Sequence, residues 1–164
     1  MNASRTLTHD EIARRIPHQG DMCLLDTVTD WDSDRIACQA SNHQAAGNPL
    51  RAQGRLGAAC GVEYAAQAMA VHGSLVAESM AGGLEADAVP RAGYLTSIRS
   101  VSLHVDRLDT IAAPLTISAE RITGDNNTVL YSFAVKSGDT ALLSGRAVVV
   151  LDASALALPP TTPG

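Results

Sequence analysis

The sequence predicts an α+β domain in which one curved antiparallel sheet encloses one long helix. An apolar segment without strand alternation occupies residues 56–77. Residues 93–151 instead show segments of alternating apolar and polar residues, separated by turn residues. A helix that is apolar on nearly all sides cannot lie on a wet surface, so the strands are expected to cover it.

The first elements are a short helix and a hairpin. Thr8 and Glu11 have the capping-box spacing, which predicts a helix that reaches Arg15. Residues 22–31 alternate as a strand, an Asp-Ser-Asp turn follows, and residues 35–41 return as the antiparallel partner.

A polar loop over 42–55 leads to the long helix over 56–77, which would span roughly 30 Å at the rise of an α-helix. An acidic loop over 79–90 follows. Four further strands are then expected, at 93–105, 115–122, 129–136 and 141–151. We expect one domain over 1–152 and a mobile proline-containing tail over 153–164.

This order describes a hotdog fold, in which one sheet curls around one helix, although other α+β folds can share the order. The composition fits a globular protein: 164 residues, of which 46% are hydrophobic and 18% charged. A mean hydropathy of +0.06 is high for a soluble monomer and favours an oligomer.

The charge and the aromatic content exclude some partners. A net charge of −5 has the wrong sign for binding phosphate backbones, and 3% aromatic residues leave no platform for stacking bases. No nucleic-acid partner is therefore expected.

The cysteines and the N-terminus favour the cytoplasm. Three cysteines without C-x-x-C spacing predict reduced thiols rather than disulfides or a zinc site. The first residues lack the apolar region of a signal peptide, and polar side chains within 56–77 argue against a membrane span. The three cysteines are Cys23, Cys38 and Cys60.

Glu63 is the main candidate for chemistry. It is the one acidic or basic side chain within GAACGVEYAAQAMAV, residues 57–71. Burial favours the neutral form of a carboxyl group, which is the form that a general acid needs. Gln67 lies one helical turn further on and is expected to hydrogen-bond that carboxyl. The alternative is a structural acid that caps a loop or pairs with an arginine at a subunit interface.

Two of the five histidines are candidates for a base. His43 lies in the loop that leads to the long helix, where a scaffold can present a catalytic group. His18 is the reserve candidate, with a structural role as its alternative. We expect His9 to be solvated and His72 to lie at an interface or on the surface, and His104 has no special feature.

Several common motifs are absent. The sequence contains no G-x-S-x-G, P-loop, G-x-G-x-x-G or H-E-x-x-H, so serine-hydrolase, nucleotide and zinc-protease functions have no motif support.

Two motifs resemble the hotdog-fold 3-hydroxyacyl-acyl-carrier-protein dehydratases. Residues 16–18, Ile-Pro-His, followed by Met-Cys-Leu-Leu-Asp at 22–26, resemble the opening motif of that family, and residues 61–69 resemble its central helix. The sequence is most similar to the divergent ApeP-like subgroup of aryl-polyene-type biosynthesis. This similarity also includes His43, Asn-Pro-Leu at 48–50 and Leu-His-Val-Asp-Arg-Leu at 103–108.

The resemblance implies a dehydratase that needs no cofactor and no metal. His43 corresponds to the catalytic histidine and Glu63 to the helix carboxylate. His43 would remove the α-proton of a 3-hydroxyacyl thioester while Glu63 protonates the departing hydroxyl, which gives a trans-2-enoyl thioester and water. Gln67 would orient Glu63, and N–H groups of Leu56 and Gly57 would hold the thioester oxygen.

The sequence departs from the family pattern at two points. Gln-Ala-Ala-Gly-Asn-Pro at 44–49 replaces Phe-Pro-Gly after His43, and Gly57-Ala58 replaces Pro-Gly before the helix. An acyl-thioesterase and a non-catalytic acyl-binding subunit of a dehydratase heteromer therefore remain alternatives.

The expected partners follow from the resemblance. They are an acyl-carrier protein with its acyl-phosphopantetheine and a second hotdog subunit, identical or related. Arginine side chains are candidates for docking the carrier protein: Arg14, Arg15, Arg51 and Arg55.

Overall fold

A computed structural model describes residues 6–16, 20–80, 94–125 and 128–150. Pro17, His18, most of the expected acidic loop and the expected tail lie outside these residues, so the predictions made for them are not tested here.

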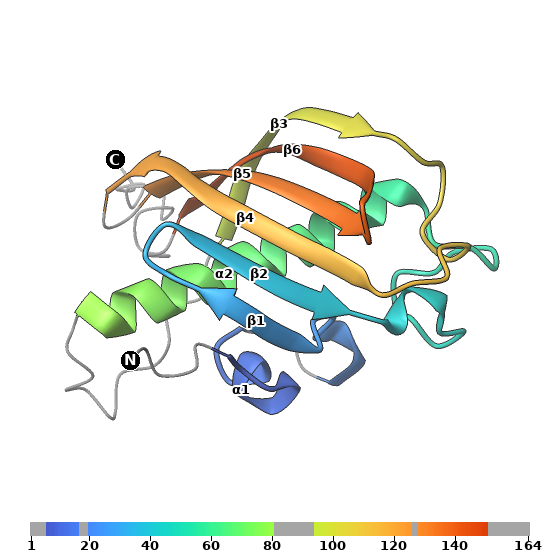
Figure 1. The fold of residues 1–164 in the computed structure, drawn as a ribbon, viewed down its shortest axis with the longest axis horizontal. Helices are drawn as coiled ribbons and strands as arrows, with labels where there is room; N and C mark the ends of the chain where they lie inside the picture. Colours follow the sequence, from blue (N-terminus) through green and yellow to red (C-terminus); the bar gives the residue numbers. More distant parts are fainter. Residues whose placement is uncertain (1–5, 17–19, 81–93, 126–127, 151–164) are drawn as a thin grey trace, which may run out of the picture.

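The strands form one six-stranded antiparallel sheet, with the order β1-β2-β4-β5-β6-β3 (Figure 1). Each predicted strand is present, with shifted ends. β1 is the most shortened: it begins at Thr27 rather than at the predicted residue 22, which ends a 3₁₀ turn over 20–22. The strands are β1 (Thr27–Trp31), β2 (Arg35–Ala40), β3 (Tyr94–Leu103), β4 (Leu115–Gly124), β5 (Thr128–Ser137) and β6 (Thr140–Val150).

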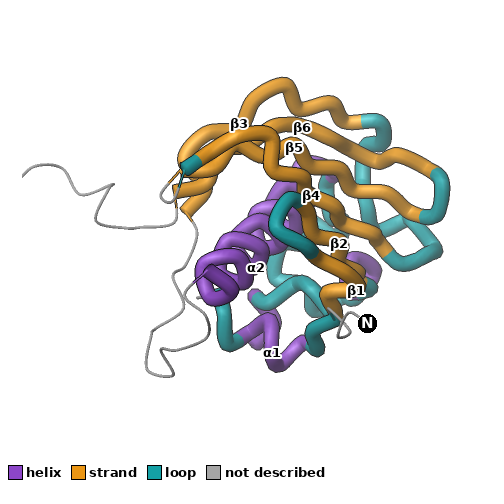
Figure 2. Tube along the Cα trace, turned by 60° about the vertical axis from the view of Figure 1, so that its left-hand side comes forward, coloured by secondary structure: helices purple, strands orange, loops and turns teal. Residues whose placement is uncertain are grey.

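The long helix α2 (Gly61–Met80) lies in the concave side of the curved sheet (Figure 2). It begins later than predicted because Ala58–Cys60 form a separate 3₁₀ turn. Gly61 allows the close approach of helix and sheet, since a β-carbon there would lie 2.5 Å from Cδ2 of Leu143 in β6. This layering is the predicted hotdog fold.

The short helix α1 (His9–Ala13) has the predicted capping box. Glu11 N–H donates to the Thr8 hydroxyl, and the Glu11 carboxylate accepts from Thr8 N–H at 3.1 Å. The helix ends two residues before the predicted Arg15, with Arg14 as its C-cap.

The core lies between α2 and the inner face of the sheet. Alternate residues of β4 and β5 point inward and are buried, as the period of a strand requires. Nearly every side chain of α2 from Tyr64 to Leu75 is buried as well. Full burial of one aliphatic side chain contributes about 1.5–3 kcal/mol, so this helix is a main source of stability.

One prediction about this helix is wrong. His72, expected at the surface or an interface, is only 1% exposed. Its ring nitrogens lie 2.6 Å from the Tyr131 hydroxyl and 2.7 Å from the Asp32 carbonyl oxygen. Because the sheet curves around α2, the side of the helix opposite Glu63 is also covered.

No helix in the described part of the chain is long and apolar enough to cross a membrane.

Candidate functional site

His43 lies in a 3₁₀ turn (Asn42–Gln44) that directly follows β2 and is 1% exposed. Its Nε2 is 2.9 Å from the carbonyl oxygen of Ile111. A carbonyl oxygen only accepts hydrogen bonds, so in the neutral ring Nε2 carries the proton and Nδ1 carries the lone pair. Nδ1 is buried and has no hydrogen-bond partner among the described residues. The ring therefore presents a basic nitrogen that the protein leaves unused.

Tyr64 ties the His43 loop to the first turns of α2. Its hydroxyl donates to Asn42 Oδ1 at 2.8 Å and accepts from Asn48 Nδ2 at 3.0 Å. The Asn48 amide also donates to the Asn42 carbonyl at 2.9 Å. Tyr64 is fully buried and Asn48 is 6% exposed. Water therefore competes little for the hydrogen bonds of this cluster.

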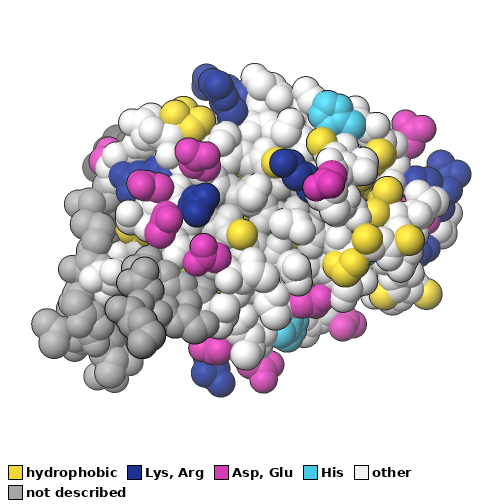
Figure 3. Space-filling view, in the orientation of Figure 1, with side chains coloured by type: hydrophobic (Ala, Val, Ile, Leu, Met, Phe, Trp, Pro, Cys, Tyr) yellow, Lys and Arg dark blue, Asp and Glu magenta, His cyan; other side chains and the backbone are white. Residues whose placement is uncertain are grey.

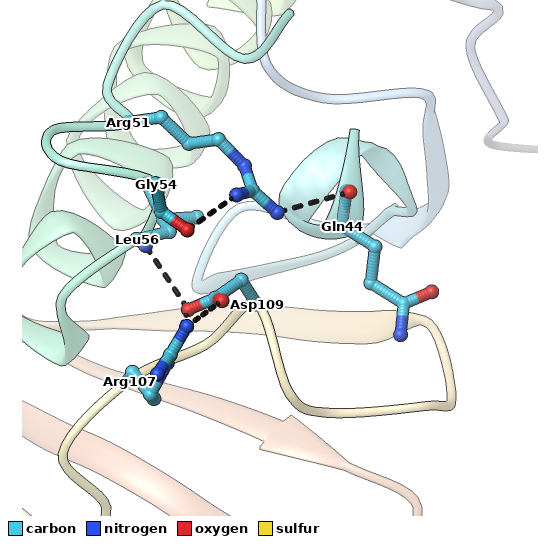
Figure 4. A network of polar contacts seen from close by, with 6 residues as sticks. All are labelled: Gln44, Arg51, Gly54, Leu56, Arg107 and Asp109. Atoms are coloured by element: carbon cyan, nitrogen blue, oxygen red, sulfur yellow. Dashed lines mark hydrogen bonds and ion pairs between the residues drawn. The ribbon is translucent and has the colours of Figure 1, made fainter. Parts of the chain in front are cut away.

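Arg51 clamps the same loop from the other side (Figure 4). Its guanidinium donates to the carbonyl oxygens of Gly54 at 2.8 Å and Gln44 at 3.1 Å. Gln44 directly follows His43, so Arg51 helps to fix the main chain on that side of the imidazole. The guanidinium thus binds the protein's own main chain, and the expected docking role of Arg51 stays a prediction.

Asp109 joins the segment before α2 to the loop that supplies Ile111. Its carboxylate accepts from Leu56 N–H at 3.0 Å and from the Arg107 guanidinium, with 2.9 Å between Nε and Oδ1 (Figure 4). The Arg107 hydrogen bond and then the Leu56 N–H hold the pKa of Asp109 well below its usual range. The carboxylate is thus charged while it holds this junction.

The Leu56 N–H cannot play its expected role in this arrangement. Asp109 already accepts from it, so it is not available for a thioester oxygen. Gly57 differs, because a β-carbon there would meet no other atom within 4 Å. Of the two expected donors, Gly57 is the one that lies beside open space.

Glu63 lies in the first turn of α2, directly before Tyr64, and is half-buried. Because Tyr64 binds Asn42, the residues next to Glu63 and His43 in the chain are in direct contact. The described hydrogen bond of the His43 ring is to Ile111, so a joint action of His43 and Glu63 stays a prediction.

The Gln67 amide binds main chain rather than its expected partner Glu63. Its Oε1 accepts from Leu24 N–H at 2.8 Å, and its Nε2 donates to the Met22 carbonyl at 2.7 Å. Gln67 is 1% exposed, so both ends of a buried amide are satisfied in this way. Gln67 thus holds the segment before β1 against α2 through these two hydrogen bonds.

The remaining histidines have weaker claims. His18 lies outside the described residues. His9 and His104 are exposed, and Nδ1 of His9 lies 2.9 Å from the Leu25 carbonyl oxygen.

The other arginines proposed for docking lie in different surroundings, and their docking role stays a prediction. Arg15 pairs with Glu78 at 2.5 Å and donates to Ser74, whereas Arg14 and Arg55 are exposed. Figure 3 shows acidic and basic side chains interspersed on the face that it presents, rather than one continuous basic patch.

The cysteines are unsuited to nucleophilic catalysis. All three are free. Burial raises the pKa of Cys38 to about 12 and also raises the pKa of Cys23 and Cys60, which disfavours the reactive thiolate. Among the described residues, no three His, Cys, Asp or Glu side chains form a group that could hold a metal ion.

Sequence reasoning did not assign a role to Tyr64, Asn48, Arg107 or Asp109. A signal was present for Tyr64, Asn48 and Arg107, because each lies within a motif that carries the family resemblance, and Asp109 follows the last motif by one residue. Their hydrogen-bond partners are up to 53 residues away in the chain, which no local pattern discloses.

A family model described as ApeP-like, ApeP dehydratase, matches residues 10–157. The chain belongs to the ApeP-like dehydratase family. The matched residues include the His43 loop and the central helix described above.

Solved structures extend the comparison. The dehydratase heterocomplex ApeI:P from Xenorhabdus doucetiae is 25% identical, with a TM-score of 0.73 over 89% of this chain and 91% of that one. The thioesterase HI1161 from Haemophilus influenzae is 12% identical, with a TM-score of 0.59 over 90% and 92% of the two chains.

A hypothetical thioesterase with coenzyme A from Streptococcus pneumoniae is 9% identical, with a TM-score of 0.52 over 76% of this chain and 84% of that one. At such identities, likeness to the two thioesterases shows the hotdog fold alone. Comparison with curated protein sequences gives no match.

Proposed function

We propose that the protein removes water from a 3-hydroxyacyl thioester carried on an acyl-carrier protein and forms the trans-2-enoyl thioester. The observation that carries this proposal is the His43 ring, whose Nε2 is held by Ile111 and whose buried Nδ1 has no partner among the described residues. A general base needs such a nitrogen, with its lone pair free and its ring fixed.

The proposed reaction conserves atoms and protons. His43 Nδ1 takes the α-proton, the electrons of that C–H bond form the Cα=Cβ double bond, and the Cβ–O bond breaks. Glu63 gives its proton to the departing hydroxyl, which leaves as water. Transfer of the proton from His43 back to Glu63 through solvent restores the starting state. The Gly57 N–H is our candidate for polarising the thioester carbonyl, because the position of a β-carbon at Gly57 is open space.

The sheet supports a partner subunit at its β3 edge. The opposite edge strand, β1, is partly covered because Leu7 and Val28 exchange two backbone hydrogen bonds. Among the described strands β3 pairs with β6 alone, and it carries exposed apolar side chains at Ile98, Val101 and Leu103. An exposed apolar edge strand is a template for pairing with another chain.

We propose that a second hotdog subunit, identical or related, pairs at this edge. The heterocomplex ApeI:P, a structural neighbour of this chain, supports a related partner. The free cysteines support the cytoplasm as the place where this assembly works.

The deciding experiment gives the purified protein a 3-hydroxyacyl thioester and follows both the conjugated enoyl product and free thiol. We expect enoyl product without thiol release. His43→Gln and Glu63→Gln should each lower the rate about a hundredfold or more, because each removes one of the two proton-transferring groups. His104→Gln is the matched control, since His104 is exposed.

Full dehydration by both site variants would disprove the assignment of the site. Release of free thiol without enoyl product would instead identify a thioesterase.

A further inference from the structure

We infer that Tyr64 is a positioning residue that holds the base His43 in its reactive orientation through Asn42. This inference rests on the proposed function. It concerns a residue whose hydroxyl hydrogen-bonds Asn42 and Asn48 rather than the proposed base.

The first step is the contact between Tyr64 and Asn42. The Tyr64 hydroxyl donates to Asn42 Oδ1 at 2.8 Å, and Asn42 directly precedes His43. Asn48 reinforces the contact, since its Nδ2 donates both to the Tyr64 hydroxyl and to the Asn42 carbonyl. Both the side chain and the main chain of the residue before His43 are therefore held.

The second step is the other end of the imidazole. The Ile111 carbonyl accepts from Nε2 and fixes the tautomer, but one hydrogen bond leaves the ring free to pivot about it. The Tyr64 cluster fixes the main chain from which the ring projects. Together the two anchors determine where the Nδ1 lone pair points.

The third step is the place of Tyr64 in α2. It directly follows Glu63, so the turn of helix that carries the proposed acid also carries the anchor of the base. One hydrogen bond thereby joins the helical turn that carries Glu63 to the loop that carries His43. Burial raises the pKa of Tyr64 to about 12, which keeps its hydroxyl a donor throughout the physiological range.

The chain offers a matched control for removing this hydroxyl. Tyr131 is also buried, at 1% exposed, and its hydroxyl also hydrogen-bonds a buried partner, the His72 ring. Tyr64→Phe and Tyr131→Phe therefore remove the same atom from comparable surroundings, and only the first loosens His43.

The kinetic test compares these two variants in the dehydration assay, below the temperature at which either unfolds. We expect Tyr64→Phe to lower kcat about tenfold with KM changed less than about twofold, because the base is displaced while substrate binding remains. Tyr131→Phe should keep the wild-type kcat.

The second test does not depend on activity. The ¹⁵N resonances of the His43 ring should show an unprotonated Nδ1 and a protonated Nε2 in the wild type and in Tyr131→Phe. Tyr64→Phe should give averaged ring resonances, because the ring then samples several orientations.

The outcomes separate this inference from the proposed function. Wild-type kinetics and unchanged His43 resonances in Tyr64→Phe, with His43→Gln inactive, would overturn the positioning role alone. Absence of enoyl product from the wild-type protein would overturn the proposed function, and full activity of His43→Gln would overturn the assignment of His43 as the base. In either case the ring resonances would still decide whether Tyr64 holds His43.

Discussion

His43 and His72 are both 1% exposed, and each depends on a buried tyrosine, yet they are built for different tasks. Both ring nitrogens of His72 have partners, the Tyr131 hydroxyl and the Asp32 carbonyl oxygen. At His43 a main-chain carbonyl holds Nε2, and Nδ1 has no described partner. Burial alone therefore does not distinguish the structural His72 from the proposed base His43, whereas the number of ring nitrogens with described partners does.

The surroundings of His72 keep it neutral. Burial lowers its pKa, and the nearby Arg121 acts in the same direction, against the opposing effects of Asp32 and Asp34. Its ring lies edge-on to Tyr131, with 5.5 Å between the centroids. Because Asp32 O can only accept, Nε2 donates to it, and Nδ1 accepts from the Tyr131 hydroxyl. The pair joins α2 to β5 and to the β1–β2 turn.

The largest expected difference comes from the same substitution at both histidines. His43→Gln should lower kcat about a hundredfold or more and should destabilise the fold less than His72→Gln, since only one of its two ring nitrogens has a partner in the described part of the fold. His72→Gln should leave kcat near the wild-type value and lower the free energy of unfolding by about 2–4 kcal/mol, because buried groups lose their partners. Steady-state kinetics of both variants measure kcat, and urea unfolding measures their free energies of unfolding. An equal decrease in kcat in the two variants would contradict the different roles assigned to His43 and His72.

Tyr131→Phe tests the structural pair more gently. Nδ1 of His72 would lose the hydroxyl that lies 2.6 Å from it, which should lower the free energy of unfolding by about 1–3 kcal/mol. Urea unfolding monitored by circular dichroism gives the value, and an unchanged midpoint would show that this hydrogen bond contributes nothing.

The pH dependence of stability should also reveal His72. In the unfolded chain a histidine binds a proton below about pH 6.5. Folded His72, with its lowered pKa, does so only at a lower pH. The stabilisation is therefore present above about pH 6.5 and is lost as the pH falls towards the folded pKa.

Urea unfolding at pH 7.5 and 5.5 should accordingly show a smaller decrease in stability for His72→Gln than for the wild type. The same decrease in both proteins would mean that other groups cause it.

The smallest effect is expected at the turn that supplies the carbonyl for His72. The Asp32 carboxylate accepts from the N–H groups of Asp34 at 2.8 Å and Arg35 at 3.0 Å. Asp32→Ala should lower the free energy of unfolding by about 1 kcal/mol. Asp32→Asn should change it by less than about 0.5 kcal/mol, because an Asn oxygen can accept the same bonds. Thermal unfolding of the two variants measures both losses of stability. Equal losses would show that the hydrogen bonds accepted by the side chain of residue 32 do not stabilise the turn.

Local patterns predicted most of the fold because their physical causes are local. The capping box, the hairpin turn at 32–34 and the alternation of β4 and β5 depend on residues only a few positions apart. The apolar sequence of α2 predicted that this helix is buried, because a helix that is apolar on nearly all sides is unfavourable in contact with water. His43 and Glu63 could be named as candidates from their places in the chain and from the family resemblance.

The partners of the site residues were decided by the tertiary structure alone. Gln67 binds main chain at Met22 and Leu24 rather than Glu63, and Asp109 occupies the Leu56 N–H that was expected to face substrate. Both bonds join segments that are far apart in the chain and meet only when the sheet has closed around α2. Sequence patterning thus determined which segments are buried, although not the burial of His72. The closed sheet decided which polar groups pair with one another, because those pairs depend on distances between segments that periodicity does not contain.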